Sequence, residues 1–191
     1  MHTDLDSRTF SNLSYLLLAA TAAASIYLFV DGRWIGAGVL AGLVVLAIIF
    51  IAQREKLPSI FTLFFVSAAV INAAGYIVDL WKTPYWFDEF VHFYTSFTIM
   101  AAIGWLLFSR TSMNAAGNTV RFVLSIVGLG IGLGILWEVF EWIIGIIGNR
   151  WDTILDLIMD TLGAVAAGLF CGWAAKRMGR GSCADGAART A

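Results

Sequence analysis

Long uncharged stretches recur along the chain and are separated by short polar segments. Four of these stretches contain no charged residue: Leu13–Val30, Trp34–Ala52, Ile60–Val78 and Phe93–Ser109. Helices of this length rise about 1.5 Å per residue and match a bilayer hydrocarbon core of roughly 30 Å. Two further apolar stretches, at 122–148 and 154–175, have the same character but carry acidic residues. The pattern therefore predicts six membrane-spanning helices.

The predicted fold is an all-α bundle, a polytopic membrane protein with one domain covering residues 1–175. We expect its transmembrane helices at 13–31, 34–52, 60–80, 89–109, 122–148 and 154–175. The composition agrees, since 60% of the residues are hydrophobic and the mean hydropathy is +0.82. The last segment, 176–191, is basic and rich in Gly and Ala, which predicts a disordered cytoplasmic tail. The first twelve residues are a poor match to a cleaved signal peptide, because they hold two acids and one arginine.

Basic residues are divided unevenly between the two sides of this predicted bundle. With the N-terminus in the cytoplasm, nine of the twelve Lys and Arg residues lie inside and three lie outside. The three outside residues are Arg33, Lys82 and Arg150. The positive-inside rule then predicts that both termini are cytoplasmic.

Acidic residues enter the last three predicted helices from the outer side. Together with one histidine they form three closely spaced pairs: Asp88 and His92, Glu138 and Glu141, and Asp156 and Asp160. Spacings of three or four residues place each pair on one helix face. From helix rise, Glu141 should lie about 10 Å, Glu138 about 15 Å and Asp160 about 9 Å below the outer end. A charge near the bilayer centre costs about 2.5–3.5 kcal/mol on insertion scales, so these side chains need partners.

One imidazole and several carboxylates form an oxygen-rich ligand set that suits Mg²⁺, Mn²⁺, Ca²⁺ or Zn²⁺. We therefore predict a divalent metal site near the outer face, with these six residues as its ligands: Asp88, His92, Glu138, Glu141, Asp156 and Asp160. Asp152 is expected to cap the last helix instead. The same residues also fit a hydrogen-bonded structural cluster with some protonated carboxyls. No catalytic residue is assigned.

Glycines on the last two predicted helices indicate close packing beside these acids. Gly128/Gly132 and Gly130/Gly134 form two G-x-x-x-G pairs, and Gly168/Gly172 form a third. Small residues at this spacing let helix backbones approach each other. We expect Gly130 or Gly132 to pack against a neighbouring helix, with the other free to face lipid.

Three segments together resemble the YjdF-like bacterial inner-membrane proteins, an uncharacterised family: "WFDEFVHFYTSF", "WEVFEWIIG" and "DTILDLIMDTLGAVAAG". The likeness covers about Tyr85–Gly168. A more distant resemblance is to VanZ-like membrane proteins, which also read D-x-x-x-H, a later Glu, and then an Asp with a small-residue helix. Both resemblances imply a bacterial inner-membrane location and point to the five acids and one histidine above together with Gly163. They imply no established reaction.

The function expected from this pattern is binding or modification of an envelope lipid or lipid-linked substrate at the outer acidic site. The expected partners are membrane lipids and a lipid-like substrate, and nucleic acid is not expected. Proton- or cation-coupled transport is an alternative, since buried acids can form a relay. A non-catalytic module that binds a lipid head group or a partner protein is another. The absence of cysteine clusters, phosphate-binding glycine loops and Ser-His-Asp order argues against thiolate, nucleotide-fold and serine-hydrolase chemistry.

Overall fold

The computed structural model describes residues 7–81, 86–111, 115–145 and 150–188, and all regular structure in these ranges is helical. The elements are α1 (Arg8–Val30), α2 (Trp34–Ala52), α3 (Ser59–Val78), α4 (Trp86–Thr111), α5 (Ala115–Ile144) and α6 (Arg150–Ala188). Six helices in this part of the chain are long and apolar enough to cross a membrane. The predicted all-α, six-span architecture is therefore confirmed.

Several helix ends differ from the sequence expectation, and each has a local cause. α1 begins at Arg8 because the Ser7 hydroxyl accepts a hydrogen bond of 3.1 Å from the Phe10 amide and caps the first turn. α5 ends at Ile144, where Gly145 adopts a φ of 73°. Glycine takes this left-handed conformation at little cost and commonly ends helices. The expected outer loops include 82–85, with Lys82, and 146–149, which lie outside the described residues.

α6 continues to Ala188 instead of ending at residue 175, and so extends over most of the segment for which the sequence predicts a disordered tail. Alanine, lysine, arginine and methionine favour the helical conformation, and these types recur after Ala175. Extending an existing helix adds one hydrogen bond per residue without a new nucleation step. The composition that suggests disorder in isolation is thus compatible with helix when it follows a stable span.

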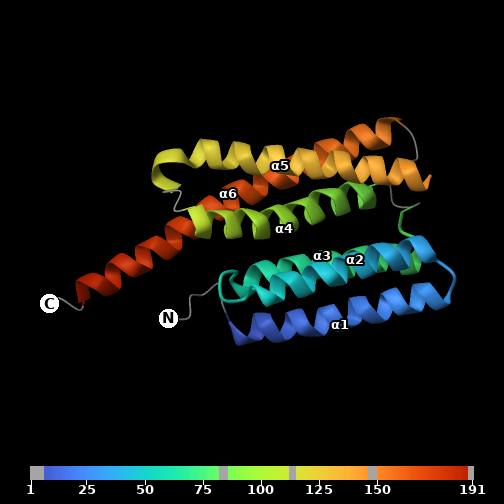
Figure 1. Ribbon diagram of the computed structural model, residues 1–191, viewed down its shortest axis with the longest axis horizontal. Coiled ribbons are helices and arrows are strands. Elements are labelled where there is room, and N and C mark those ends of the chain that lie inside the picture. Colours follow the sequence, from blue (N-terminus) through green and yellow to red (C-terminus); the bar gives the residue numbers. More distant parts are fainter. Residues whose placement is uncertain (1–6, 82–85, 112–114, 146–149, 189–191) are drawn as a thin grey trace.

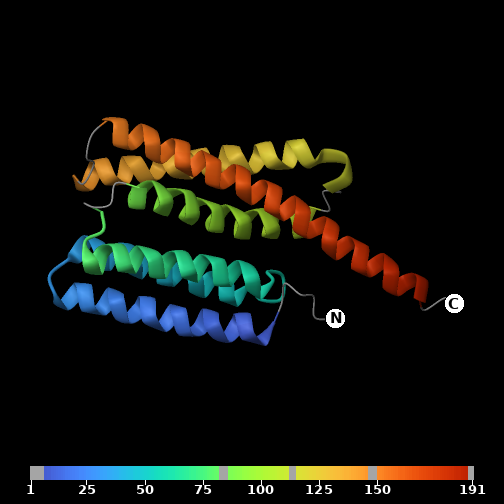
Figure 2. The same ribbon diagram turned by 180° about the vertical axis from the view of Figure 1, so that it is seen from behind.

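The helices form two groups of three that lie side by side (Figures 1 and 2). α1, α2 and α3 pack against one another, α4, α5 and α6 do the same, and α3 contacts α4 across the boundary. The start of α1 and the end of α6 lie at one end of the bundle, as an even number of spans requires, and the last residues of α3 and α5 lie at the other (Figure 1). The second group carries all of the predicted site residues.

Aromatic side chains join the two groups. The Phe170 ring on α6 lies 5.6 Å from that of Phe61 and 5.8 Å from that of Phe64, both on α3. The indole of Trp105 donates a hydrogen bond of 2.9 Å to the carbonyl oxygen of Lys56, before α3 begins. Phe61 and Phe65 are fully buried. These contacts hold α4 and α6 against α3 and leave the opposite end of the second group to the polar residues.

Glycines set the distances between α6 and its neighbours. A Cβ on Gly163 would clash with the Phe93 carbonyl oxygen of α4, and one on Gly130 would clash with the Ala164 side chain. Gly132, in contrast, has nothing within 4 Å of its Cβ position. The prediction that one of Gly130 and Gly132 packs on a helix is therefore confirmed for Gly130. The close approach brings the acidic faces of α5 and α6 together.

Candidate functional site

Three helices deliver polar side chains to the same level of the bundle. His92, Asp156 and Glu138 each lie six residues from a helix end, counted from Trp86, Arg150 and Ile144 respectively. At about 1.5 Å per residue this is a depth of about 9 Å for each of them. The depths expected from sequence change accordingly: Glu138 lies nearer the end of its helix than expected, and Asp160, ten residues after Arg150, lies deeper. The level is set by the true helix ends, which the sequence pattern misplaced by a few residues.

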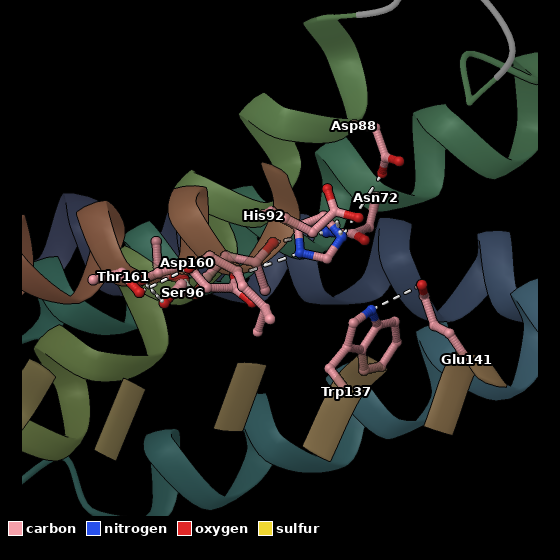
Figure 3. A network of polar contacts seen from close by, with 12 residues as sticks. Asn72, Asp88, His92, Ser96, Trp137, Glu141, Asp160 and Thr161 are labelled. Atoms are coloured by element: carbon pink, nitrogen blue, oxygen red, sulfur yellow. Dashed lines mark hydrogen bonds and ion pairs between the residues drawn. The ribbon is translucent and has the colours of Figure 1, made fainter. Parts of the chain in front are cut away.

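The imidazole of His92 is the centre of the site. Its Nε2 lies 3.8 Å from Asp88 Oδ1 and 3.8 Å from Asp156 Oδ1. Its Nδ1, on the other edge of the ring, lies 3.5 Å from Asp160 Oδ1. Figure 3 shows the ring between Asp88 and Asp160. His92, Asp156 and Asp160 are buried, whereas the Asp88 side chain is 30% exposed and marks the outer side of the cluster.

Asp160 is fixed from two sides. The Ser96 hydroxyl on α4 donates a hydrogen bond of 2.8 Å to the Asp160 backbone carbonyl oxygen. A Cβ on Gly134 of α5 would lie 2.6 Å from Asp160 Oδ2, so the carboxylate occupies space that only glycine leaves free. Neither Ser96 nor Gly134 was predicted as part of the site. Their spacing in the sequence could have identified both residues. Ser96 continues the four-residue step of Asp88 and His92, and Gly134 precedes Glu138 by four residues.

Glu138 and Glu141 reach the cluster from α5 in different ways. Glu138 is 6% exposed and interacts electrostatically with His92 and Asp160. Both of its carboxylate oxygens are buried, and neither has a hydrogen bond of good geometry among the described residues. The Thr153 side chain lies close enough to interact with this carboxylate. Glu141 accepts a hydrogen bond of 2.9 Å from the Trp137 indole and lies to one side of the histidine (Figure 3). Glu138 is thus a buried carboxylate in need of a partner, whereas Glu141 already has one.

Asp152 is not the helix cap expected from the sequence. It lies in the first turn of α6, two residues after the helix begins at Arg150. It interacts electrostatically with Asp88, Glu138 and Asp156. It therefore adds negative charge near the start of α6, close to Asp88.

Hydrogen bonds from α3 steady the α4 helix beside the cluster. The Asn72 side-chain amide donates to Thr95 Oγ1 at 3.1 Å and to the Ala68 carbonyl oxygen at 3.0 Å. One turn earlier on α3, the Ser67 hydroxyl lies 2.8 Å from the Tyr94 hydroxyl. Sequence reasoning did not single out these residues, because isolated Asn, Ser and Thr in apolar helices give no spacing signal of their own.

The arrangement offers ligand atoms at a spacing suited to one cation. One atom each from Asp88, His92 and Asp156 lies within 4.8 Å of the others, close enough for the three to hold a metal ion. Metal–ligand distances of about 2.0–2.6 Å allow ligand atoms on opposite sides of an ion to be this far apart. Among the described residues, the ion pairs of Asp88, Asp156 and Asp160 involve His92 and no Lys or Arg. A dication would supply the positive charge that this cluster of carboxylates lacks.

Comparison with known proteins gives a family and no activity. No curated protein and no solved structure matches the chain. A family model described as a predicted membrane protein (DUF2238) matches residues 11–177, a range that begins inside the first span, passes the end of the sixth and contains every residue of the site. The chain therefore belongs to this family of predicted membrane proteins.

Proposed function

We propose that this protein binds a divalent metal ion through Asp88, His92 and Asp156, and that the loaded site binds or modifies the head group of an envelope lipid or lipid-linked substrate. The single observation that carries the proposal is the group of Asp88, His92 and Asp156, two of them buried and Asp88 partly exposed, whose ligand atoms come within 4.8 Å of one another. We place the protein in a bacterial inner membrane with both termini in the cytoplasm, where the basic residues are expected. We also propose that the chain is related to the YjdF-like bacterial inner-membrane proteins, which three of its segments resemble.

The metal is favoured by charge and depth. Three carboxylates, of Glu138, Asp156 and Asp160, and the His92 imidazole are gathered about 9 Å or more inside the helix ends, where unpaired charge is costly. Mixed imidazole and carboxylate ligation is well suited to Zn²⁺ and Mn²⁺, whereas Mg²⁺ and Ca²⁺ take oxygen ligands. Any of these dications would offset repulsion between the acids.

A lipid-type substrate is favoured by where the site lies. Asp88, the most exposed of the close group, opens the cluster toward the end of the bundle where α3 joins α4. If this end faces outward, lipid head groups of the outer leaflet lie at the same level. A bound dication would contribute an electrophilic centre for a phosphate or carbonyl oxygen of the head group. The chain's own carboxylates would position the ion and exclude other anions.

Proton or cation transport is the second candidate, and one feature favours it. Asp88, His92 and Asp160 form a connected series from a partly exposed to a buried group, with contacts of 3.8 Å and 3.5 Å. Series of ionisable side chains inside membrane helices are typical of proton relays. The relay and metal proposals differ in whether the wild-type protein retains an ion.

The decisive experiment is metal analysis and isothermal titration of detergent-purified protein with Zn²⁺, Mn²⁺, Mg²⁺ and Ca²⁺. We expect one ion per chain in the wild type and strongly reduced affinity in Asp156→Asn. Asp31→Asn is the matched control, because Asp31 is an acid in the α1–α2 turn paired with Arg33 at 2.7 Å and remote in sequence from the cluster. Wild-type protein that binds none of the four ions would reject the metal, and proton flux in proteoliposomes would then test the relay.

The lipid part needs a separate measurement. Short-chain phosphatidic acid and short-chain phosphatidylcholine, each added with and without the preferred ion, distinguish a head-group site from general lipid adsorption. We expect ion-dependent binding of the phosphatidic acid, lost in Asp156→Asn and kept in Asp31→Asn. Equal binding of both lipids irrespective of the ion would reject the head-group site.

A further inference from the structure

We infer that Asp160 is a positioning residue and not a ligand: it holds His92 through Nδ1 so that Nε2 faces the cation, and Glu138 takes the remaining ligand place. This inference rests on the proposed metal site and assigns its ligands as Asp88, His92 Nε2, Asp156 and Glu138. It also narrows the ion to a first-row transition dication, with Zn²⁺ or Mn²⁺ as the expected class.

The two edges of the imidazole face different partners. Nε2 lies 3.8 Å from each of Asp88 and Asp156, whose oxygens together with Nε2 form the compact ligand group. Nδ1 points the other way, 3.5 Å from Asp160. An ion held by Nε2 therefore leaves Nδ1–H free to donate to Asp160. Metal-binding histidines commonly donate their second ring N–H to a carboxylate, which fixes the orientation of the ring.

Asp160 is itself held in a way that suits this role. Ser96 fixes its backbone carbonyl oxygen, and the missing side chain of Gly134 gives its Oδ2 room against α5. Three helices thus determine the position of one carboxylate: α6 supplies it, α4 anchors its backbone and α5 limits its side chain. A carboxylate held this firmly on the Nδ1 edge of the ring could not turn to the Nε2 edge without leaving the space beside Gly134.

Glu138 is outside the compact group of Asp88, His92 and Asp156, and it provides independent support for a cation beside that group. Its side chain is more than nine-tenths buried, and neither carboxylate oxygen has a hydrogen-bond partner among the residues described. It interacts electrostatically with Asp88 and Asp156 as well as with His92. A buried carboxylate without hydrogen bonds is costly unless a cation or a proton compensates it. Coordination supplies that compensation and completes a set of three carboxylates and one imidazole.

The ligand set decides the ion class. Imidazole nitrogen is a good ligand for Zn²⁺ and other first-row ions, and carboxylates suit Mn²⁺. Ca²⁺ requires six to eight oxygen ligands, and Mg²⁺ retains most of its water, so neither gains much from His92. Zn²⁺ or Mn²⁺ should therefore bind more tightly than Mg²⁺ or Ca²⁺.

Two measurements on the full chain test the inference. Titration with Zn²⁺ and Mn²⁺ compares wild type, Asp160→Leu, Asp160→Asn and Glu138→Gln. Asp160→Leu should lower the affinity by about 10–100-fold while keeping one ion per chain, as expected for loss of an orienting partner. Asp160→Asn, which keeps a carbonyl acceptor, should recover part of the loss, whereas Glu138→Gln should lower the affinity as a lost ligand does. Wild-type affinity in Asp160→Leu, or loss of binding as complete as in Asp156→Asn, would overturn the positioning role.

The second measurement needs no metal. The chain has two histidines, so His2→Gln leaves His92 as the one imidazole to observe by ¹⁵N NMR. In metal-free protein, Nδ1 should carry a proton that is hydrogen-bonded to Asp160. Asp160→Leu should abolish this hydrogen bond. Gly134→Ala should have the same effect by displacing Asp160, and Gly132→Ala, whose Cβ meets nothing within 4 Å, is its matched control. An unprotonated Nδ1 in the wild type would overturn the inference, whereas a protonated Nδ1 in a protein that binds no ion would reject only the metal site.

Discussion

The contact between α4 and α6 at Gly163 should be the least tolerant of added volume near the site. A Cβ at this position would clash with the carbonyl oxygen of Phe93, and it would lie 2.9 Å from the Phe97 amide nitrogen and 3.1 Å from Ser96 Cβ. Two of these three atoms belong to the backbone of α4, so no side-chain rotation can relieve the overlap. Gly163→Ala must therefore push the two helices apart.

The size of the effect follows from the geometry. Carbon atoms in good contact lie about 3.5–4.0 Å apart, so α4 and α6 would have to separate by roughly 1 Å. Overpacking of this kind costs about 1–3 kcal/mol, and displacement of backbone favours the upper end. Alanine also favours helix over glycine by about 1 kcal/mol, which offsets part of this cost. Gly132→Ala has the same gain in helix propensity but no clash, since nothing lies within 4 Å of its Cβ position. The difference between the two variants therefore isolates the packing cost, about 2–3 kcal/mol or roughly 100-fold in the unfolding equilibrium.

Unfolding by sodium dodecyl sulfate from detergent micelles measures this difference directly. The midpoint of Gly163→Ala should fall below that of the wild type, and the midpoint of Gly132→Ala should stay equal or rise. Because Ser96 adjoins this contact and donates a hydrogen bond to the Asp160 carbonyl oxygen, Gly163→Ala should also weaken metal binding. Equal midpoints for the two variants would refute the close approach of α4 and α6 at Gly163.

Three further predictions concern orientation and packing. In a Cys183→Ser background, cysteines introduced at Thr83 and Asn149 should react with a membrane-impermeant maleimide in intact cells; reaction only after permeabilisation would reverse the proposed orientation. Phe170→Ala should destabilise the protein by about 3 kcal/mol, because its ring contacts those of Phe61, Phe64 and Phe97 and joins the two groups of helices; Leu169→Ala, at a side chain that is 59% exposed, is the control in the same unfolding assay and should differ little from the wild type. A double-mutant cycle of Asn72→Leu and Thr95→Val should give a coupling of about 0.6 kcal/mol, the usual size for hydrogen bonds between membrane helices; additive effects would mean that the 3.1 Å contact contributes no stability.

The residues of the candidate site were visible in the sequence, because charge in an apolar helix stands out. Asp88 with His92 and Asp156 with Asp160 repeat at four residues, and helical geometry alone places each pair on one face. The number of membrane spans could be predicted from the sequence for a related reason. A bilayer requires each crossing to satisfy its own backbone hydrogen bonds, so length and apolarity are sufficient to identify a helix.

Helix ends were harder to predict, because they depend on local contacts that hydrophobicity does not report. The Ser7 cap extended α1, and the positive φ of Gly145 followed the end of α5. The continuation of α6 to Ala188 depended on a preceding stable span that nucleates it. The end of α5 at Ile144 and the start of α6 at Arg150 changed the estimated depths of Glu138, Glu141 and Asp160. With these ends, His92, Asp156 and Glu138 lie at a common level.

The sequence by itself determined that the chain is a six-span helical protein with acids on three consecutive helices. The tertiary structure alone decided which of those acids meet. Gly130 and Gly132 are chemically identical and two residues apart, yet one packs on Ala164 and the other faces open space. Likewise Asp156 and Asp160 share a face of α6, but one faces Nε2 of His92 and the other faces Nδ1. Spacing fixes the relation between residues on one helix, whereas the rotation of that helix against its neighbours comes from packing between residues far apart in the chain.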